Sequence, residues 1–344
     1  TTGSTNVAIG HDSLAQNTTA SNNTAVGYSA LTANTTATNG TAVGSYALDA
    51  NTTGVNNTGI GANALSTNTT GEESVAVGTN SLFANTTGSY NNAVGKSALT
   101  TNTTGTKNQA FGHSALELNT TGNFNTAIGH KALEANTTGL YNVAVGAEAL
   151  KTNVSTHYNA AIGSYALQSN IASNNTAMGY GALSDNTTGD ANVALGTGTL
   201  DANTTGANNT GLGWGALGAN TTGSNNIGVG RDSVRTNTTG TYLVGIGIQA
   251  LYYNTSGTNN TAVGYNSLFA NTTGGGNVAV GYAALDANTT ANYNTGLGYY
   301  ALSANTTGTK NVGIGTGAAQ LITTGSYNTA VGGDALDANV TGSA

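Results

Sequence analysis

The fold is decided by residues 23–39, which read NTAVGYSALTANTTATN. The same unit returns every 17 residues from one end of the chain to the other. Twenty glycines mark it, from Gly10 to Gly332, each preceded by a branched or long apolar residue, and only the step from Gly163 to Gly179 is short, at 16 residues. So strict a short period is typical of a solenoid, in which each coil contacts only its neighbours.

The residues of the repeat favour strands over helices. A 17-residue unit that contains Asn-Thr-Thr in most copies leaves no room for a pair of helices, and a propeller blade needs about 40 residues. The β-branched residues before each glycine are typical of strands. We therefore predict an all-β fold in which residues 1–344 form one continuous parallel β-solenoid (β-roll) of about twenty 17-residue coils, without visible caps. A one-residue deletion near residues 170–175 explains the short step.

Apolar columns predict which side of each strand faces the core. When the coils are aligned on the glycine, the residue before it is always apolar, as Val26 is, and the residue two places earlier is Thr24 or an equivalent. Because alternate strand residues share a face, we predict that these two positions point inward. A nearly constant Leu column, which includes Leu31, completes the predicted core, with Val234 and Ala319 as exceptions.

Two asparagine columns predict hydrogen-bonded ladders. Identical amides one coil apart can bond along the stack, as they do in cross-β assemblies. One column is Asn in nineteen of twenty coils, with Ile322 as the exception, and the second contains Asn23 and its equivalents. The first column begins with Asn17, Asn34, Asn51, Asn68, Asn85 and Asn102.

The residue between the two positions predicted to face inward is Ala or Gly in all twenty coils. By strand alternation it should point away from its own core. A position that stays so small suggests the close approach of another surface, either a neighbouring subunit or a covering segment of the same chain. We favour a lateral interface between subunits, represented by Ala8, Ala25, Ala42, Gly59, Ala76, Gly211, Gly228, Gly313 and Ala330.

Composition limits the classes of function. Charged residues make up only 6% of the chain, and the net charge is −7. No basic stripe is present to neutralise phosphates, so we expect no nucleic-acid partner. No run of about 18 apolar residues suggests a membrane span. Cysteine is absent, which excludes disulfides and thiolate metal sites and is compatible with an exported surface protein.

Short motifs resemble a known family. Asn6-Val7-Ala8-Ile9-Gly10, Ser74-Val75-Ala76-Val77-Gly78 and residues 125–133 (NTAIGHKAL) are similar to the head repeats of YadA-type trimeric autotransporter adhesins and to related repeats of phage tail fibres and other surface proteins. The resemblance covers essentially the whole chain. It implies a left-handed β-roll, side-by-side trimers and binding to host surfaces, although those heads usually repeat at about 14 residues.

Residues that could carry chemistry are few and scattered. His113 and His130 share a column, so they should lie about 5 Å apart, but no further metal ligands stand nearby in the columns. Glu117 and Glu134 share a second column, in which Lys151 follows one coil further, and this favours a surface charge ladder over a glycosidase pair. We predict no catalytic, metal or cofactor site and no enzymatic activity.

Aromatic residues gather in the C-terminal third of the chain. Exposed aromatic side chains can bind sugars or another protein, although they can equally cap grooves between coils and stabilise the stack. A shorter run in the first half contains Phe124, Tyr141 and Tyr158. The candidate recognition residues are Tyr252, Tyr253, Tyr265, Phe269, Tyr282, Tyr293, Tyr299 and Tyr300.

These patterns predict a structural or adhesive fibre protein at a cell or virion surface. It would associate with itself, as a homotrimer or a filament, and would bind a host-surface protein or carbohydrate. Ice binding is a second hypothesis, because Thr35, Thr52 and Thr69 form one row along the stack and Thr36 and Thr53 begin another. A third is a filament subunit that stacks end to end, because the sequence begins and ends at nearly the same phase of the repeat.

Overall fold

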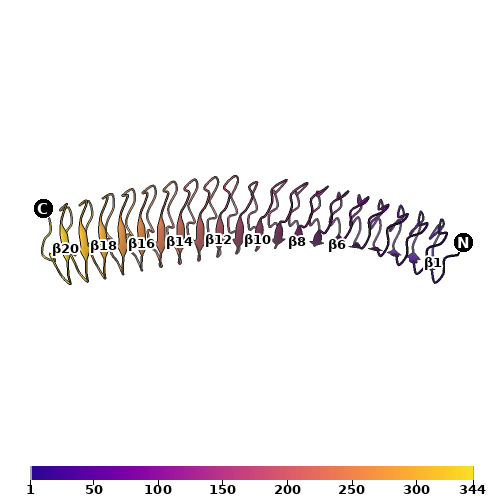
Figure 1. Cartoon of the computed structure of the whole chain (residues 1–344), viewed down its shortest axis with the longest axis horizontal. Helices are drawn as coiled ribbons and strands as arrows, with labels where there is room; N and C mark the ends of the chain where they lie inside the picture. The colour runs from indigo at the N-terminus through magenta and orange to yellow at the C-terminus, as the bar shows by residue number, and fades with distance from the viewer. Residues whose placement is uncertain (1, 344) are drawn as a thin grey trace. The chain divides into compact units, whose positions relative to one another are not determined.

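The computed structural model describes residues 2–343, which form two compact units, the first ending at Ser173 and the second beginning at Asn174. The boundary lies in the short step of the repeat, within the segment where the sequence places the deletion. Each unit contains ten strands of three residues (Figure 1), and the described residues contain no helix. The single domain expected from the repeat is therefore described as two units.

The first unit is a stack of ten coils with one short strand in each. Its strands pair in parallel and in register, so that Ala25 lies opposite Ala42 and Val26 opposite Val43. The strands are β1 (Val7–Ile9), β2 (Thr24–Val26), β3 (Thr41–Val43), β4 (Thr58–Ile60), β5 (Val75–Val77), β6 (Asn92–Val94), β7 (Gln109–Phe111), β8 (Thr126–Ile128), β9 (Val143–Val145) and β10 (Ala160–Ile162).

The second unit repeats this arrangement, and Ala177 lies opposite Ala194 in its first strand pair. Each residue again pairs with the residue 17 positions further on, which confirms the predicted parallel β-solenoid. The strands are β11 (Thr176–Met178), β12 (Val193–Leu195), β13 (Thr210–Leu212), β14 (Ile227–Val229), β15 (Val244–Ile246), β16 (Thr261–Val263), β17 (Val278–Val280), β18 (Thr295–Leu297), β19 (Val312–Ile314) and β20 (Thr329–Val331).

The glycine that ends each strand is required by both conformation and space. Gly61 has a φ of 132°, a region that side chains disfavour. A Cβ atom built on Gly61 would lie 2.6 Å from the carbonyl oxygen of Gly78 in the next coil. Any other residue would separate the two coils at this point, which explains why this glycine marks every repeat.

The leucine column fills the core, as predicted. Leu48 and Leu150 are fully buried, and so are the exceptions Val234 and Ala319. Each leucine occupies the left-handed region, with a φ of 52° at Leu150, which costs roughly 1–2 kcal/mol for an L-residue. Burial of a leucine side chain contributes about 1.5–3 kcal/mol. Burial therefore outweighs the backbone cost, and the turn aims the leucine into the coil.

Both asparagine columns form the predicted ladders. Asn102 Nδ2 donates to Asn85 Oδ1 at 2.8 Å and to the carbonyl oxygen of Gly105 at 3.0 Å. In the second column, Asn91 Oδ1 accepts the backbone N–H of Asn108 at 3.0 Å. These buried amides bond both to one another and to the backbone of the turns, so they satisfy polar groups that would otherwise be costly inside the stack.

The predicted orientation of the strands is wrong. The middle residue of each strand points into the coil, as fully buried Ala25 and Ala144 show, and the two flanking residues point outward. Ile60 and Ile128 remain 40% and 42% exposed. The alternation of inward and outward residues along the strand was predicted correctly, but the inward and outward faces were interchanged. The predicted inward pair, typified by Thr24 and Val26, is the outer side of the strand.

The predicted lateral interface is wrong for the same reason. Gly59 shows why the middle position is small, because a Cβ atom placed there would lie 3.3 Å from Leu48 Cγ of the preceding coil. The leucine packs against the strand from inside and leaves space for little more than a methyl group. In this column Ala8 is exposed in the first coil, and the buried members are Ala25, Ala42, Gly59, Ala76, Gly211, Gly228, Gly313 and Ala330.

Candidate functional surfaces

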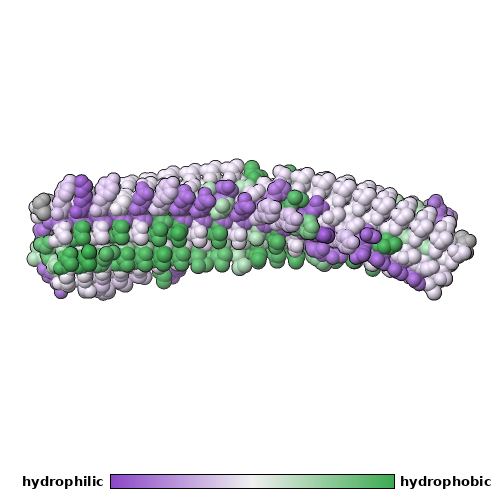
Figure 2. Space-filling model, viewed as in Figure 1, coloured by the Kyte–Doolittle hydropathy of each residue, from purple (hydrophilic) through white to green (hydrophobic). Residues whose placement is uncertain are grey.

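The outward side of the strands presents a row of apolar side chains in each unit. We define the outer strand face as the first and third residues of every strand. Its third position holds Val or Ile in fifteen of the twenty strands and Leu, Phe or Met in the others. Figure 2 shows the apolar band that these residues make along the strands of the second unit, where Leu212 is 46% exposed.

None of the side chains on the outer strand face is charged in the twenty described strands. The first position holds Thr in nine strands and Val in seven, and its amides are Asn92 and Gln109. At about 4.8 Å per coil, ten coils make a strip about 48 Å long in each unit. Contiguous exposed apolar surfaces of several hundred Å² mark interaction sites in soluble proteins.

The first unit also carries a column of stacked rings at the turn before the strand. Phe124 and Tyr141 have ring centroids 4.9 Å apart, and Tyr141 and Tyr158 are 5.5 Å apart with nearly parallel planes. Lys107 Nζ lies 4.9 Å from the Phe124 centroid on the other side. The broad faces of Phe124 and Tyr141 are therefore covered by neighbours in the column, and their edges remain exposed.

The predicted recognition aromatics of the second unit fall into three groups. Tyr265, Tyr282 and Tyr299 stack at 5.2 Å intervals, and Tyr300 meets Tyr299 edge to face at 4.5 Å. The second group packs at centroid distances of 4.7 to 5.5 Å. It consists of Tyr252, Tyr253 and Phe269. Stacking of this kind stabilises adjacent coils. The third group is Tyr293 by itself, which makes no ring contact with another of these residues.

The histidine pair behaves as its spacing predicts. His113 and His130 stack with ring centroids 5.5 Å apart and an interplanar angle of 16°. Among residues 2–343, no three His, Cys, Asp or Glu side chains lie together as metal ligands would. The imidazoles thus extend the stacking seen in the tyrosine columns, as His11 does with Tyr28 at 5.4 Å.

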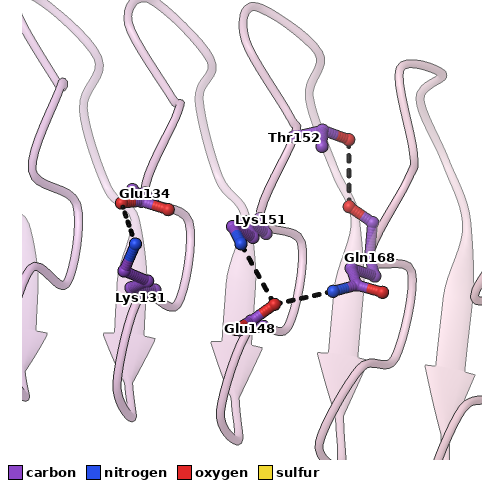
Figure 3. Close-up of polar contacts among 6 residues, drawn as sticks. All are labelled: Lys131, Glu134, Glu148, Lys151, Thr152 and Gln168. Carbon is purple, nitrogen blue, oxygen red and sulfur yellow. Dashed lines mark hydrogen bonds and ion pairs between the residues drawn. The ribbon is translucent and has the colours of Figure 1, made fainter.

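The eighth and ninth coils each carry one lysine–glutamate ion pair (Figure 3). Lys131 Nζ is 3.0 Å from Glu134 Oε1, and in the next coil Lys151 Nζ is 3.1 Å from Glu148 Oε2. Gln168 Nε2 donates to the same Glu148 oxygen at 2.7 Å. Because the order of the charges is reversed between the coils, each charge also faces an opposite charge along the stack.

The two ion pairs favour the charged forms of Glu148 and Lys131. The hydrogen bond from Lys151 lowers the pKa of Glu148, and the hydrogen bond to Glu134 raises the pKa of Lys131. A general acid at neutral pH would need a raised carboxyl pKa instead. The adjoining hollow of about 290 Å³ is lined by Glu117 and by the paired Glu134 and Lys151, beside Leu118 and Thr152, which supports the predicted charge ladder.

Three aspartates in one column have pKa values that are shifted upward, in contrast to that of Glu148. Burial raises the pKa of Asp49, Asp201 and Asp286 above the ordinary value of 3.8. At Asp49 the hydroxyl of Ser66, which donates to Oδ1 at 2.7 Å, lowers the pKa in part. These carboxyls lie on different coils and form no pair, so their pKa values reflect burial at the edge of the turn.

Sequence reasoning missed the outer strand face, although a signal was available. The Leu column is almost invariant, whereas the third strand position accepts residues as different as Val26, Phe111 and Met178. A tightly packed interior does not tolerate such changes in volume. The variation in size therefore indicated an exposed position, and the constant small residue beside it indicated the crowded one.

Comparison of the chain with models of protein families, with curated proteins and with solved structures finds no match. Within residues 2–343 there is also no helix long and apolar enough to cross a membrane. The geometry of the chain itself must therefore carry any functional assignment.

Proposed function

We propose that the chain is a non-enzymatic structural segment of an adhesive extracellular or virion-surface fibre, whose copies associate side by side through the outer strand face. The observation that carries the proposal is the uncharged apolar strip on the strands of each unit. Residues such as Ile128, Ile162 and Leu212 stay 39–46% exposed there. The resemblance to YadA-type heads and tail-fibre repeats supports the same assignment.

A second copy of this chain suits the strip better than an unrelated partner. Copies share the 17-residue period, so apolar rows at about 4.8 Å intervals can interdigitate along each unit. The strip carries no charges that would repel the same strip on a second copy. The residues proposed for the lateral contact are therefore those that flank the buried Ala or Gly of each strand.

The test is the mass of the full chain in solution, measured by sedimentation equilibrium. We expect about three times the chain mass of 33.8 kDa, because the family resemblance implies trimers. The triple variant Val43→Lys, Ile60→Lys and Val77→Lys should sediment as a single chain, since it places three charges on adjacent strands β3, β4 and β5.

The matched control places the same three charges on exposed turn threonines in the same part of the chain, as Thr36→Lys, Thr53→Lys and Thr70→Lys. This variant should keep the wild-type mass. A wild-type chain that sediments as a monomer at every concentration would contradict side-by-side association. Open-ended polymers that survive the strand substitutions would instead indicate end-to-end stacking into a filament.

Ice binding is the second candidate, and one observation favours it. The outer strand face presents mostly Thr or Val in the first row and mostly Val or Ile in the second, at a regular repeat along each unit. The threonine row of the turn is less suited, because Thr52 and Thr69 use their hydroxyls to bond backbone carbonyls one coil away. Thermal hysteresis by a single-chain species would support this candidate, and its absence would exclude it.

A further inference from the structure

A polar hollow of about 360 Å³ lies at the turns around Gly275 and Gly276 in the second unit. The side chains around it are Ser256, Thr258, Asn259, Thr273, Asn292 and Tyr293. None of these carries a charge, and they come from three consecutive coils. The volume falls within the range of small-molecule sites.

Tyr293 differs from the stacked aromatic residues at this position of the coil. Tyr141 is stacked between Phe124 and Tyr158, and Tyr327 lies under Lys310 Nζ at 4.8 Å from its centroid. Among the described residues, Tyr293 and Tyr242 have neither a stacked ring nor a cation against them, and they are 66% and 61% exposed; of the two, it is Tyr293 that borders the hollow. It therefore offers ring surface to a ligand, which the stacked rings do not.

The glycine pair explains why the hollow exists. Gly276 takes the left-handed position, with a φ of 69°, that Asn259 and Tyr293 fill in the coils before and after it. A Cβ atom on Gly276 would lie 2.8 Å from Cδ1 of the Tyr293 ring. The ring thus leans over the glycine into space that a side chain would otherwise occupy, and the column is interrupted by a single missing side chain.

The polar groups beside the ring are held in place by the stack. Asn292 Oδ1 accepts the backbone N–H of Gly275 at 2.6 Å, which leaves its Nδ2 to donate elsewhere. Asn259 Nδ2 donates to Thr258 Oγ1 at 3.3 Å, and the exposed Asn259 side chain still has its Oδ1 acceptor. Amides and hydroxyls that surround one aromatic ring are the groups that pair with the hydroxyls and C–H faces of a sugar.

We propose that this hollow, the Tyr293 site, binds a neutral saccharide, with one pyranose ring against Tyr293 and its hydroxyls bonded to Asn259, Asn292 and Thr258. The lining of the hollow carries no charge, and Lys310 of the next coil directs its Nζ to Tyr327, which favours uncharged sugars over uronic acids or sulfated units. The site would give the fibre proposed above a ligand of defined chemistry, but its existence does not require that the chains associate.

The experiment is saturation-transfer NMR on the full chain with four probes: methyl glycosides of glucose, galactose, mannose and glucuronic acid. We expect transfer to the ring protons of at least one neutral glycoside and less transfer to the glucuronide. Tyr293→Ala should abolish the transfer, and Tyr293→Phe should retain most of it, because the ring surface remains.

Gly276→Asn is the sharper variant, because it restores a residue that Asn259 already places at the same position of the preceding coil. It should fill the hollow and abolish transfer while leaving the fold intact. Tyr242→Ala, at an exposed tyrosine of the same column without a hollow, should leave transfer unchanged. Absence of transfer to all three neutral probes, its survival in both Tyr293→Ala and Gly276→Asn, or a stronger signal from the glucuronide would overturn the assignment.

The outcome is separable from that of the proposed association. Sedimentation of Gly276→Asn should give the wild-type mass, and the strand variant with three lysines should still transfer saturation to the sugar. Loss of sugar transfer alone rejects the Tyr293 site, and loss of association alone rejects the fibre interface.

Discussion

The interior of the coil and the outer strand face use apolar side chains in different ways. Within one coil of the first unit, Ala144 and Leu150 are fully buried, whereas Val143 on the same strand is 36% exposed. The larger of the two strand residues is therefore the one that faces out. The difference shows that volume, rather than hydrophobicity, sorts the strand residues, because the leucine from the turn has already filled the narrow interior.

The largest effect should come from breaking the interior side of this comparison. Leu150→Ala removes a fully buried side chain from a stack that cannot collapse around it, and we expect a loss of about 2–5 kcal/mol in unfolding free energy. Val145→Ala, on the outer strand face of the same coil, should cost less than about 1 kcal/mol in the single chain. Guanidinium unfolding followed by circular dichroism measures both.

Both variants should be compared at a protein concentration where the chain is not associated. If Val145→Ala proved as costly there as Leu150→Ala, the outer strand face would be packed within its own chain. A cost of Val145→Ala that rises with concentration would instead indicate that another copy covers the valine.

A smaller effect is expected when a polar member of the interior is removed. Asn102→Ala deprives Asn85 Oδ1 of its donor inside the stack, where Asn102 Nδ2 lies 2.8 Å away. Leaving that buried acceptor unpaired should cost about 1–3 kcal/mol. The Gly105 carbonyl loses less, because Asn91 Nδ2 still donates to it at 2.8 Å.

Thr104→Ala is the surface counterpart of that change, since this threonine is exposed in the same coil. We expect it to alter the unfolding free energy by no more than about 0.5 kcal/mol. Equal costs for Asn102→Ala and Thr104→Ala would mean that the ladder contributes no more to stability than an ordinary surface side chain does. Unfolding curves of the two variants, recorded side by side, decide the point.

The repeat allowed much of the fold to be predicted, because a fixed period with apolar and asparagine columns has few solutions. The ladder of Asn85 and Asn102, the leucine core and the parallel register all follow from placing position i against position i+17. The period did not show which strand residues point into the coil, since Thr24 and Val26 are as compatible with a core as Ala25 is. That choice depends on how far Leu31 reaches across the coil, which periodicity does not reveal.

The candidate sites were predictable to a lesser degree. Register brought Tyr265 and Tyr282 together as expected, but it could not show that stacking would cover their faces. The hollow beside Tyr293 depends on the side chain missing from Gly276 and on the way the ring leans into that space. Such a feature arises from one interruption in one column, and a pattern averaged over twenty coils does not display it.

The smallest predicted effect contrasts two carboxylates at the surface of the turns. Burial raises the pKa of Asp286 above 3.8, so the folded chain holds this proton to higher pH than the unfolded chain does. Asp286 therefore lowers stability as the pH rises through the window above 3.8. Asp286→Asn should raise the melting temperature at pH 7 and leave it unchanged at pH 3, where the aspartate is already neutral.

Glu148 should respond with the opposite sign. Its pKa lies below the ordinary 4.5 because Lys151 donates to it, so its contribution to stability is present above pH 4.5 and is lost as the pH falls through its folded pKa. Glu148→Gln should lower the melting temperature at pH 7, and the difference from wild type should shrink on acidification. Calorimetric scans of both variants at several pH values provide the measurement. Shifts of the same sign at pH 7 would show that burial at Asp286 and pairing at Glu148 do not control these two carboxyls in opposite directions.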